Sequence, residues 1–266
     1  MIRIAFLFLL GWICFFNGMH ATAQSLKPFN TTTLVAESDT NHLSGTLVFP
    51  AEERPHPLVL LIAGSGHTDR DGNQPNHQAD SYKKLAEALV QYNIASLRYD
   101  KRGVGESSQV NDEAALRFDD YIDDAVHWIQ MLKKDEHVSA VYVAGHSEGS
   151  LIGMIACQRI KANGFISIAG PGRPVDDLLK SQLKAVVPDS AYFAKCSHYL
   201  DTLHAGHRIE HPDSILYAIF RPSIQPYLIN WMQYDPAKEI GKLHIPVLVL
   251  QGDNDLQIDV SNANLL

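Results

Sequence analysis

Short, uninterrupted apolar segments alternate along the chain with longer segments in which apolar and polar residues alternate. Continuous apolar runs, bounded by proline, glycine or polar residues, are typical of strands in a parallel sheet that is covered on both faces. Two earlier runs also read as strands, with Asn41 and His42 between them as a turn. The predicted strands are residues 31–37, 43–49, 58–63, 94–99, 138–144, 165–169 and 246–250.

Between these strands, apolar residues recur at helical spacing. Residues 82–90 and 118–132 each carry one apolar face, and residues 151–157 are apolar almost all round, which predicts a buried helix. The second helix carries Asp120, Asp123 and Asp124, and we expect this acidic row to be solvated rather than to bind a metal. Strands that alternate with helices predict an α/β domain with a mostly parallel central sheet and helices on both faces.

One long interval interrupts this alternation. Residues 173–236 contain no strand pattern, only helical pieces rich in Leu, Tyr, His and Pro. An insertion of this length between two core strands predicts a helical lid over a site. Within it, Tyr227, Trp231 and Met232 are expected to form the apolar wall of an acyl pocket, or to pack the lid onto the core.

The N-terminus has the layout of a secretory signal peptide. Arg3 precedes an apolar run over residues 4–16, and a small-x-small site ends at Ala23. The rival interpretation, a membrane anchor, requires roughly 20 apolar residues, more than this run provides. We therefore expect residues 1–23 to be cleaved, residues 24–266 to form the domain, and the product to be secreted or periplasmic with no stable membrane span.

The amino-acid composition and net charge of the chain limit the kinds of molecule it is expected to bind. The 266 residues are 45% hydrophobic and 20% charged, as in ordinary globular proteins, and the formal net charge is -8. This balance argues against a nucleic-acid partner, which needs a cationic face. After signal cleavage the cysteines are Cys157 and Cys196, and two buried thiols are favoured over a disulfide.

The motif with the clearest chemistry is Gly145-His146-Ser147-Glu148-Gly149. It follows a β-branched apolar run and precedes an apolar helix, which is the strand–turn–helix context of a nucleophile elbow. The flanking glycines let the two backbones approach, the turn exposes Ser147, and the following helix N-terminus offers N–H donors to an oxyanion.

With this motif the chain resembles the α/β-hydrolase superfamily, and more narrowly bacterial esterases with serine-aminopeptidase-like domains. Three further segments carry the resemblance: residues 63–73, residues 98–107 with Arg102-Gly103-Val104-Gly105, and residues 251–255. The resemblance implies an oxyanion hole formed by the N–H groups of Ser65 and Glu148. It also implies that the loop at 98–107 is structural and pairs its own Arg and Asp. Residues 69–73 read as a loop held by Asp and Asn side chains rather than as a calcium loop.

The resemblance also makes Asp255 the triad acid, in preference to Asp253. In this fold the histidine follows the acid, yet residues 256–266 contain none. We therefore expect the sequence to be a C-terminally truncated form that lacks the last strand and helix, leaves residues 246–250 as an exposed edge strand, and is poorly soluble and nearly inactive. A metal site or a lid base among four histidines remains an alternative: His198, His204, His207 and His211.

Three functions remain open at this stage. The first is a carboxylesterase acting on small acyl esters through Ser147, Asp255 and a histidine that this sequence does not contain, with no metal or organic cofactor. The second is an aminopeptidase-like enzyme that takes short peptides, with Asp176, Asp177, Asp201 or Glu210 available to bind a substrate ammonium. The third is a catalytically inactive binding protein on a hydrolase fold.

Overall fold

The computed structural model describes residues 27–37, 42–187 and 189–266. The predicted signal peptide and Asn41 of the predicted turn lie outside the described residues. Within them, the predicted strands all form, and they join in a single sheet.

One sheet contains seven strands in the order β1-β2-β4-β3-β5-β6-β7. The pairs β1 with β2 and β2 with β4 are antiparallel, and the remaining neighbours are parallel. The strands are β1 (Phe29–Glu37), β2 (His42–Pro50), β3 (His56–Ile62), β4 (Ala95–Tyr99), β5 (Val138–His146), β6 (Gly164–Ile168) and β7 (Val247–Leu250). This is the mostly parallel sheet that the sequence predicts.

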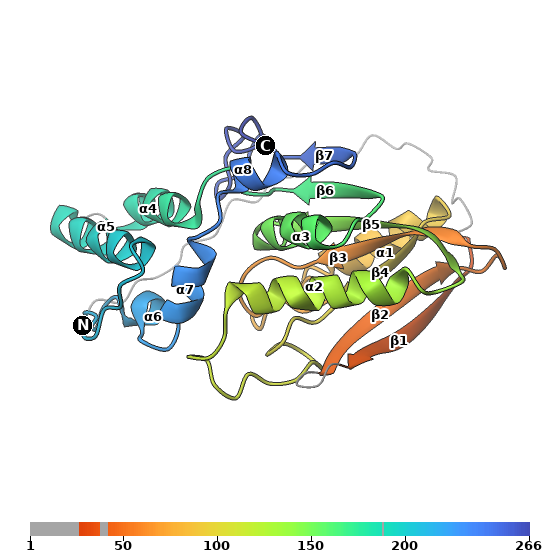
Figure 1. Cartoon of the computed structure of the whole chain (residues 1–266), viewed down its shortest axis with the longest axis horizontal. Coiled ribbons are helices and arrows are strands. Elements are labelled where there is room, and N and C mark those ends of the chain that lie inside the picture. The colour runs from red at the N-terminus through yellow and green to blue at the C-terminus, as the bar shows by residue number, and fades with distance from the viewer. Residues whose placement is uncertain (1–26, 38–41, 188) are drawn as a thin grey trace, which may run out of the picture.

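Helices cover both faces of this sheet. Helix α1 (Ser81–Gln91) packs on one face, whereas α2 (Phe118–Leu132) and α3 (Glu148–Arg159) lie side by side on the other (Figure 1). The larger core lies under α2 and α3, where Trp128 and Phe165 are fully buried. Helix α3 is buried along most of its length, as its apolar sequence predicts.

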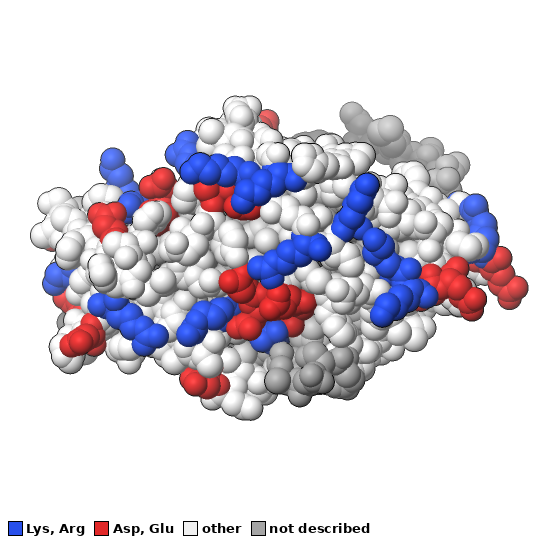
Figure 2. All heavy atoms as spheres, in the orientation of Figure 1, with Lys and Arg blue, Asp and Glu red and all other residues white. Residues whose placement is uncertain are grey.

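The expectation of a solvated acidic row on α2 is wrong at one position. Asp124 is 5% exposed and accepts hydrogen bonds from the guanidinium of Arg102 at 2.8 and 2.5 Å. Asp120 approaches the same guanidinium at 3.4 Å, and Asp123 is exposed and pairs with Arg159. The carboxylate of Asp124 can be buried because the loop after β4 brings a cation to it. Figure 2 shows acidic side chains gathered over this part of the molecular face, with basic side chains around them.

The insertion at residues 173–236 is helical and lies beyond the carboxyl ends of the parallel strands (Figure 1). It joins β6 to β7. It contains α4 (Val175–Val186), α5 (Ser190–His204), α6 (Tyr217–Phe220) and α7 (Gln225–Trp231), and α8 (Pro236–Ile240) begins at its last residue.

Helix α7 fastens the insertion to the start of α2. The rings of Trp231 and Phe118 stack with centroids 5.3 Å apart, and Asn230 exchanges hydrogen bonds with the backbone and carboxylate of Asp119. Met232 is 3% exposed and belongs to the apolar core. This part of the insertion is therefore held on the core by both ring contacts and hydrogen bonds.

Strand β7 occupies one edge of the sheet. Val247, Leu248 and Leu250 are 40%, 49% and 45% exposed, although their run is as apolar as those of the buried strands. Cys157 and Cys196 are buried free thiols, as favoured from the sequence. In the described part of the chain, no helix combines the length and the apolar character that a bilayer crossing requires.

Candidate active site

Ser147 sits on a strained turn between β5 and α3. Its backbone has φ 52° and ψ −120°, a conformation that non-glycine residues rarely adopt. The turn is held by the Ser147 N–H, which donates to the carbonyl of Ile168 at 3.0 Å. The flanking positions must be glycine because a Cβ at either one would overlap neighbouring backbone atoms. A Cβ at Gly145 would lie 2.0 Å from the carbonyl oxygen of Gly149. The geometry is that of the predicted nucleophile elbow.

The loop after β3 packs directly against this turn. A Cβ on Gly64 would meet the Cβ of Ser147 at 3.3 Å, so the glycine allows the loop to approach Ser147. The next residue, Ser65, is exposed. Further along, the Asp69 carboxylate accepts hydrogen bonds from the N–H groups of Asp71 and Asn73. The loop is therefore held by side-chain hydrogen bonds, in agreement with the sequence interpretation.

The loop after β4 departs from the pairing that the resemblance implies. Asp100 does not pair with Arg102; its carboxylate accepts hydrogen bonds from the N–H groups of Arg70 and Glu106. Arg102 instead pairs with Asp124 on α2. Asp100 is hydrogen-bonded to the loop after β3, and Arg102 forms an ion pair with α2. The loop after β4 is therefore connected to both elements.

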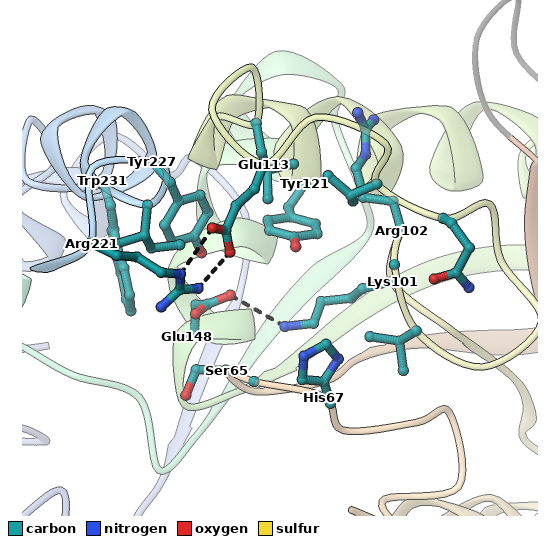
Figure 3. Close-up of a pocket in the computed structure, with 17 residues that line it drawn as sticks. Ser65, His67, Lys101, Arg102, Glu113, Tyr121, Glu148, Arg221, Tyr227 and Trp231 are labelled. Carbon is teal, nitrogen blue, oxygen red and sulfur yellow. Dashed lines mark hydrogen bonds and ion pairs between the residues drawn. The ribbon is translucent and has the colours of Figure 1, made fainter. Parts of the chain in front are cut away.

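A cavity of about 400 Å³ opens between these loops and the insertion (Figure 3). Ser65 and Glu148, the predicted oxyanion residues, line it, and so do Tyr227 and Trp231 of α7. Met232 packs in the core and is not one of the lining residues. The volume falls in the range typical of small-molecule sites. The remaining lining is mixed: Gly66, His67, Lys101, Arg102, Gly103, Val104, Gln109, Val110, Glu113, Leu116, Tyr121, Arg221 and Ile224.

Four charged groups on the cavity wall form two pairs: Lys101 with Glu148, and Glu113 with Arg221. Glu148 is 4% exposed, and its Oε1 lies 3.3 Å from the Nζ of Lys101, itself 2% exposed. Burial raises the pKa of the Tyr227 phenol well above its usual value, and the nearby carboxylate of Glu148 adds to this shift. Glu113 pairs with Arg221, and both line the cavity (Figure 3). Most of the wall between these pairs is apolar or aromatic.

Asp255 lies in the loop after β7. Its Oδ1 accepts hydrogen bonds from the N–H groups of Gln257 and Ile258 at 2.8 and 3.0 Å, and Oδ2 contacts the side-chain amide of Gln251. The carboxylate interacts electrostatically with His146, the neighbour of Ser147. Asp255 therefore lies at the carboxyl end of the parallel strands, as the elbow does. Its role as triad acid stays a prediction.

His146 does not face the cavity. Its Nδ1 lies 2.9 Å from the hydroxyl of Tyr82, and the two rings meet edge to face. Burial lowers the pKa of His146, partly offset by the charge of Asp255. The sequence interpretation, that the elbow turns this ring away from the site, agrees with this placement. In the described part of the chain, hydrogen bonds place no histidine on Ser147 or Asp255.

The four histidines of the insertion do not converge. His204 contacts the carboxylate of Asp176 at 3.2 Å, and His198 lies against the ring of Tyr199. Within the described ranges, no group of three or more His, Cys, Asp or Glu side chains is placed to hold a metal ion.

Sequence reasoning missed three charged residues of the cavity: Lys101, Glu113 and Arg221. Lys101 lies in the segment at residues 98–107, but its buried partner Glu148 is 47 positions further along the chain. Glu113 and Arg221 are 108 positions apart, and no local pattern marks either one. Only the fold brings these groups together.

The pair of Glu113 and Arg221 ties the insertion to the loop before α2. Arg221 donates two hydrogen bonds to the carboxylate, at 2.9 and 2.5 Å, and Ser223 donates another. These hydrogen bonds, those from Arg221 first, lower the pKa of Glu113. The ionised carboxylate therefore binds its partners best, and protonation weakens the connection.

This connection predicts a pH-dependent stability difference. Because the folded pKa of Glu113 is depressed, its contribution is fully present above its ordinary pKa and is lost as pH falls through the folded pKa. We expect Glu113→Gln to lower Tm at neutral pH, and the gap from wild type to narrow as the pH drops below about 4.5, the ordinary value for Glu. Thermal melts at several pH values measure it, with exposed Glu53→Gln as the control. A gap that is constant with pH would contradict the role of ionised Glu113.

Known proteins resemble this chain at two levels. Residues 76–212, just over half of the chain, match the family model described as serine aminopeptidase, S33. Esterase EstD of Thermotoga maritima is 30% identical over 257 residues. That alignment covers 92% of this chain, and the chain spans 58% of the length of EstD.

Solved structures share the fold at lower identity. Est1E of Butyrivibrio proteoclasticus, solved with ferulic acid bound, matches with a TM-score of 0.60 and 17% identity, over 87% of this chain and 83% of that one. The Pyrococcus furiosus esterase Pf2001 matches with a TM-score of 0.58 and 17% identity, over 89% and 75%. Both are α/β folds of the kind described above.

Proposed function

Because the chain belongs to the serine aminopeptidase S33 family of α/β hydrolases, we propose that it is a serine hydrolase that cleaves small carboxylic esters. The observation that carries the proposal is Ser147, held at φ 52° immediately before Glu148, which lines a cavity of suitable volume; Ser147 itself is not one of the lining residues. Such a backbone conformation costs about 1–3 kcal/mol, which a binding protein with no chemistry at this position has no reason to retain.

The proposed reaction proceeds in two halves. The Oγ of Ser147 attacks the ester carbonyl while a histidine base, which residues 256–266 do not contain, takes its proton, and Asp255 orients that base. The N–H groups of Ser65 and Glu148 stabilise the negative oxygen of the tetrahedral intermediate. The intermediate collapses, the alcohol leaves with the proton, and water then hydrolyses the acyl-enzyme by the same route. These steps require neither a metal ion nor an organic cofactor.

The cavity wall favours an ester over a peptide with a free amino terminus. An aminopeptidase must offer a carboxylate to the substrate ammonium, but Glu148 and Glu113 are already paired with Lys101 and Arg221. The acidic residues proposed for that role lie elsewhere. Asp176 and Asp201 pair with Lys180, and neither they nor Asp177 and Glu210 line the cavity among the described residues. A neutral acyl group fits the aromatic surfaces of Tyr121, Tyr227 and Trp231 without displacing any ion pair.

The proposal is tested with the purified full-length protein. A fluorophosphonate probe is expected to label Ser147, identified by mass spectrometry of the modified peptide. Hydrolysis of p-nitrophenyl acetate and butyrate should exceed hydrolysis of alanine and leucine p-nitroanilides. Absence of both labelling and ester turnover would overturn the proposal, and faster cleavage of the anilides would favour the peptidase instead.

A further inference from the structure

Lys101 lies behind the proposed oxyanion hole and is held there by two contacts. Its Nζ donates a hydrogen bond of 2.6 Å to the carbonyl oxygen of Gly64. The same Nζ lies 3.3 Å from the Oε1 of Glu148 (Figure 3). The ammonium also lies over the ring of Tyr121, 5.1 Å from its centroid. The residue is 2% exposed, so these groups replace the water that would otherwise solvate the charge.

Both contacts act on the proposed oxyanion donors. The carbonyl of Gly64 and the N–H of Ser65 belong to one planar peptide unit, so fixing the oxygen fixes the direction of the N–H. Glu148 carries the other proposed N–H, and its side chain is held by the same ammonium. We propose, as an extension of the proposed ester hydrolysis, that Lys101 is a positioning residue that keeps both oxyanion donors aimed at the reacting carbonyl.

The loop needs such an anchor because glycine permits alternatives. Gly64 has no Cβ to restrict its backbone, and Ser65 and Gly66 next to it are exposed. A rotation of the Gly64–Ser65 peptide would turn the N–H out of the site. On its other side, the Gly64 N–H donates to the hydroxyl of Tyr82 at 3.2 Å. The N–H and the carbonyl of Gly64 are thus both hydrogen-bonded. The hydrogen bond from Lys101 is the one with a charged donor.

The ammonium also strengthens the donor electrostatically. A cation on the carbonyl polarises the peptide, which makes its N–H a better donor in a region of low dielectric. Glu148 balances this charge, and the buried phenol of Tyr227 from the insertion lies near the same carboxylate. The positioning role of Lys101 therefore extends from α7, through Glu148, to the peptide beside Ser147.

The test compares Lys101→Met with the double variant Lys101→Met/Glu148→Met in the full-length protein. Lys101→Met alone leaves Glu148 buried without its cation, which lowers stability whether or not Lys101 positions the loop. The double variant removes both charges, so its Tm is expected to return toward wild type, while the Gly64 carbonyl still has no cation. Lys133→Met is the matched control, because Lys133 also donates to a backbone carbonyl but at an exposed site.

We expect kcat for p-nitrophenyl butyrate to fall about 10- to 100-fold in both Lys101 variants, somewhat less than the loss of a whole oxyanion donor. KM should change by less than about threefold, and the affinity for a boronic acid that mimics the tetrahedral intermediate should fall in parallel with kcat. Lys133→Met should match wild type. If Lys101→Met fails to fold, the double variant alone carries the comparison.

Two outcomes overturn the inference while leaving the proposed function intact. One is a double variant with wild-type kcat, which would make the lysine only a counter-ion for Glu148. The other is a loss confined to KM, with unchanged affinity for the boronic acid. A wild-type protein that neither hydrolyses esters nor binds the boronic acid would instead overturn the proposed function, and this inference with it.

Discussion

Replacing Ser147 by alanine is expected to lower kcat for ester hydrolysis about 10⁶-fold, the order found when a serine protease loses its nucleophile. The Oγ forms the bond to the acyl carbon, and no other hydroxyl occupies the strained turn between β5 and α3 in the described structure. Binding of the ester should persist, because the cavity wall is unchanged. Initial rates with p-nitrophenyl butyrate measure the effect.

A second variant at the same position separates chemistry from folding. Ser147→Gly also removes the hydroxyl, but glycine accepts φ 52° without strain, so it should be more stable than Ser147→Ala by about 1 kcal/mol. Both variants should be inactive and should not react with a fluorophosphonate. Activity in either one within tenfold of wild type would show that Ser147 is not the nucleophile.

The sheet could be predicted from the sequence because its signals are local. A run such as Leu58 to Ile62 is apolar throughout, and the structure buries it between two layers of helices. The elbow could be predicted for the same reason, since Gly145, Ser147 and Gly149 are close in sequence and their spacing fixes the turn. Physical requirements that act within a few residues leave a pattern that can be read directly.

The errors and omissions come from contacts between distant segments. Asp124 looked like part of a solvated face, because nothing near it in sequence indicates that Arg102 will cover it. The pairing of Lys101 with Glu148 depends on the crossing of the loop after β4 over the start of α3. The insertion could be predicted as helical, but which of its residues face the cavity depended on how α7 docks on Phe118. Fold class follows from periodicity, whereas the detailed wall of the site follows from docking.

The close approach of α3 to β3 leads to the second large expected effect, at Gly149. A Cβ there would lie 2.4 Å from the carbonyl oxygen of Ile62 and 2.6 Å from that of Ala63. Real Cβ atoms essentially never come this close to backbone oxygens, so α3 or the end of β3 must move. The helix cannot simply slide along its axis, because Gly145 packs against the carbonyl of Gly149.

Gly149→Ala is therefore expected to reduce the free energy of unfolding by about 3 kcal/mol or more. The direction of this stability change is informative, because replacing a helical glycine by alanine normally stabilises a protein by about 1 kcal/mol. Any folded fraction should also have lower kcat, since a shift of α3 carries the N–H of Glu148 with it. Urea denaturation followed by circular dichroism measures the stability, and ester hydrolysis measures the second effect.

The matched control is Gly241→Ala, just after α8. A Cβ at Gly241 meets its nearest atom, the carbonyl oxygen of Lys238, at an ordinary 3.5 Å, and its φ of −64° suits alanine. This variant should be neutral or stabilised by up to about 1 kcal/mol, with unchanged kcat. If Gly149→Ala behaves like Gly241→Ala, then the tight crossing of α3 over the end of β3 does not define the elbow. If stability falls while kcat per folded molecule is kept, then the position of α3 does not control the proposed oxyanion donor, the N–H of Glu148.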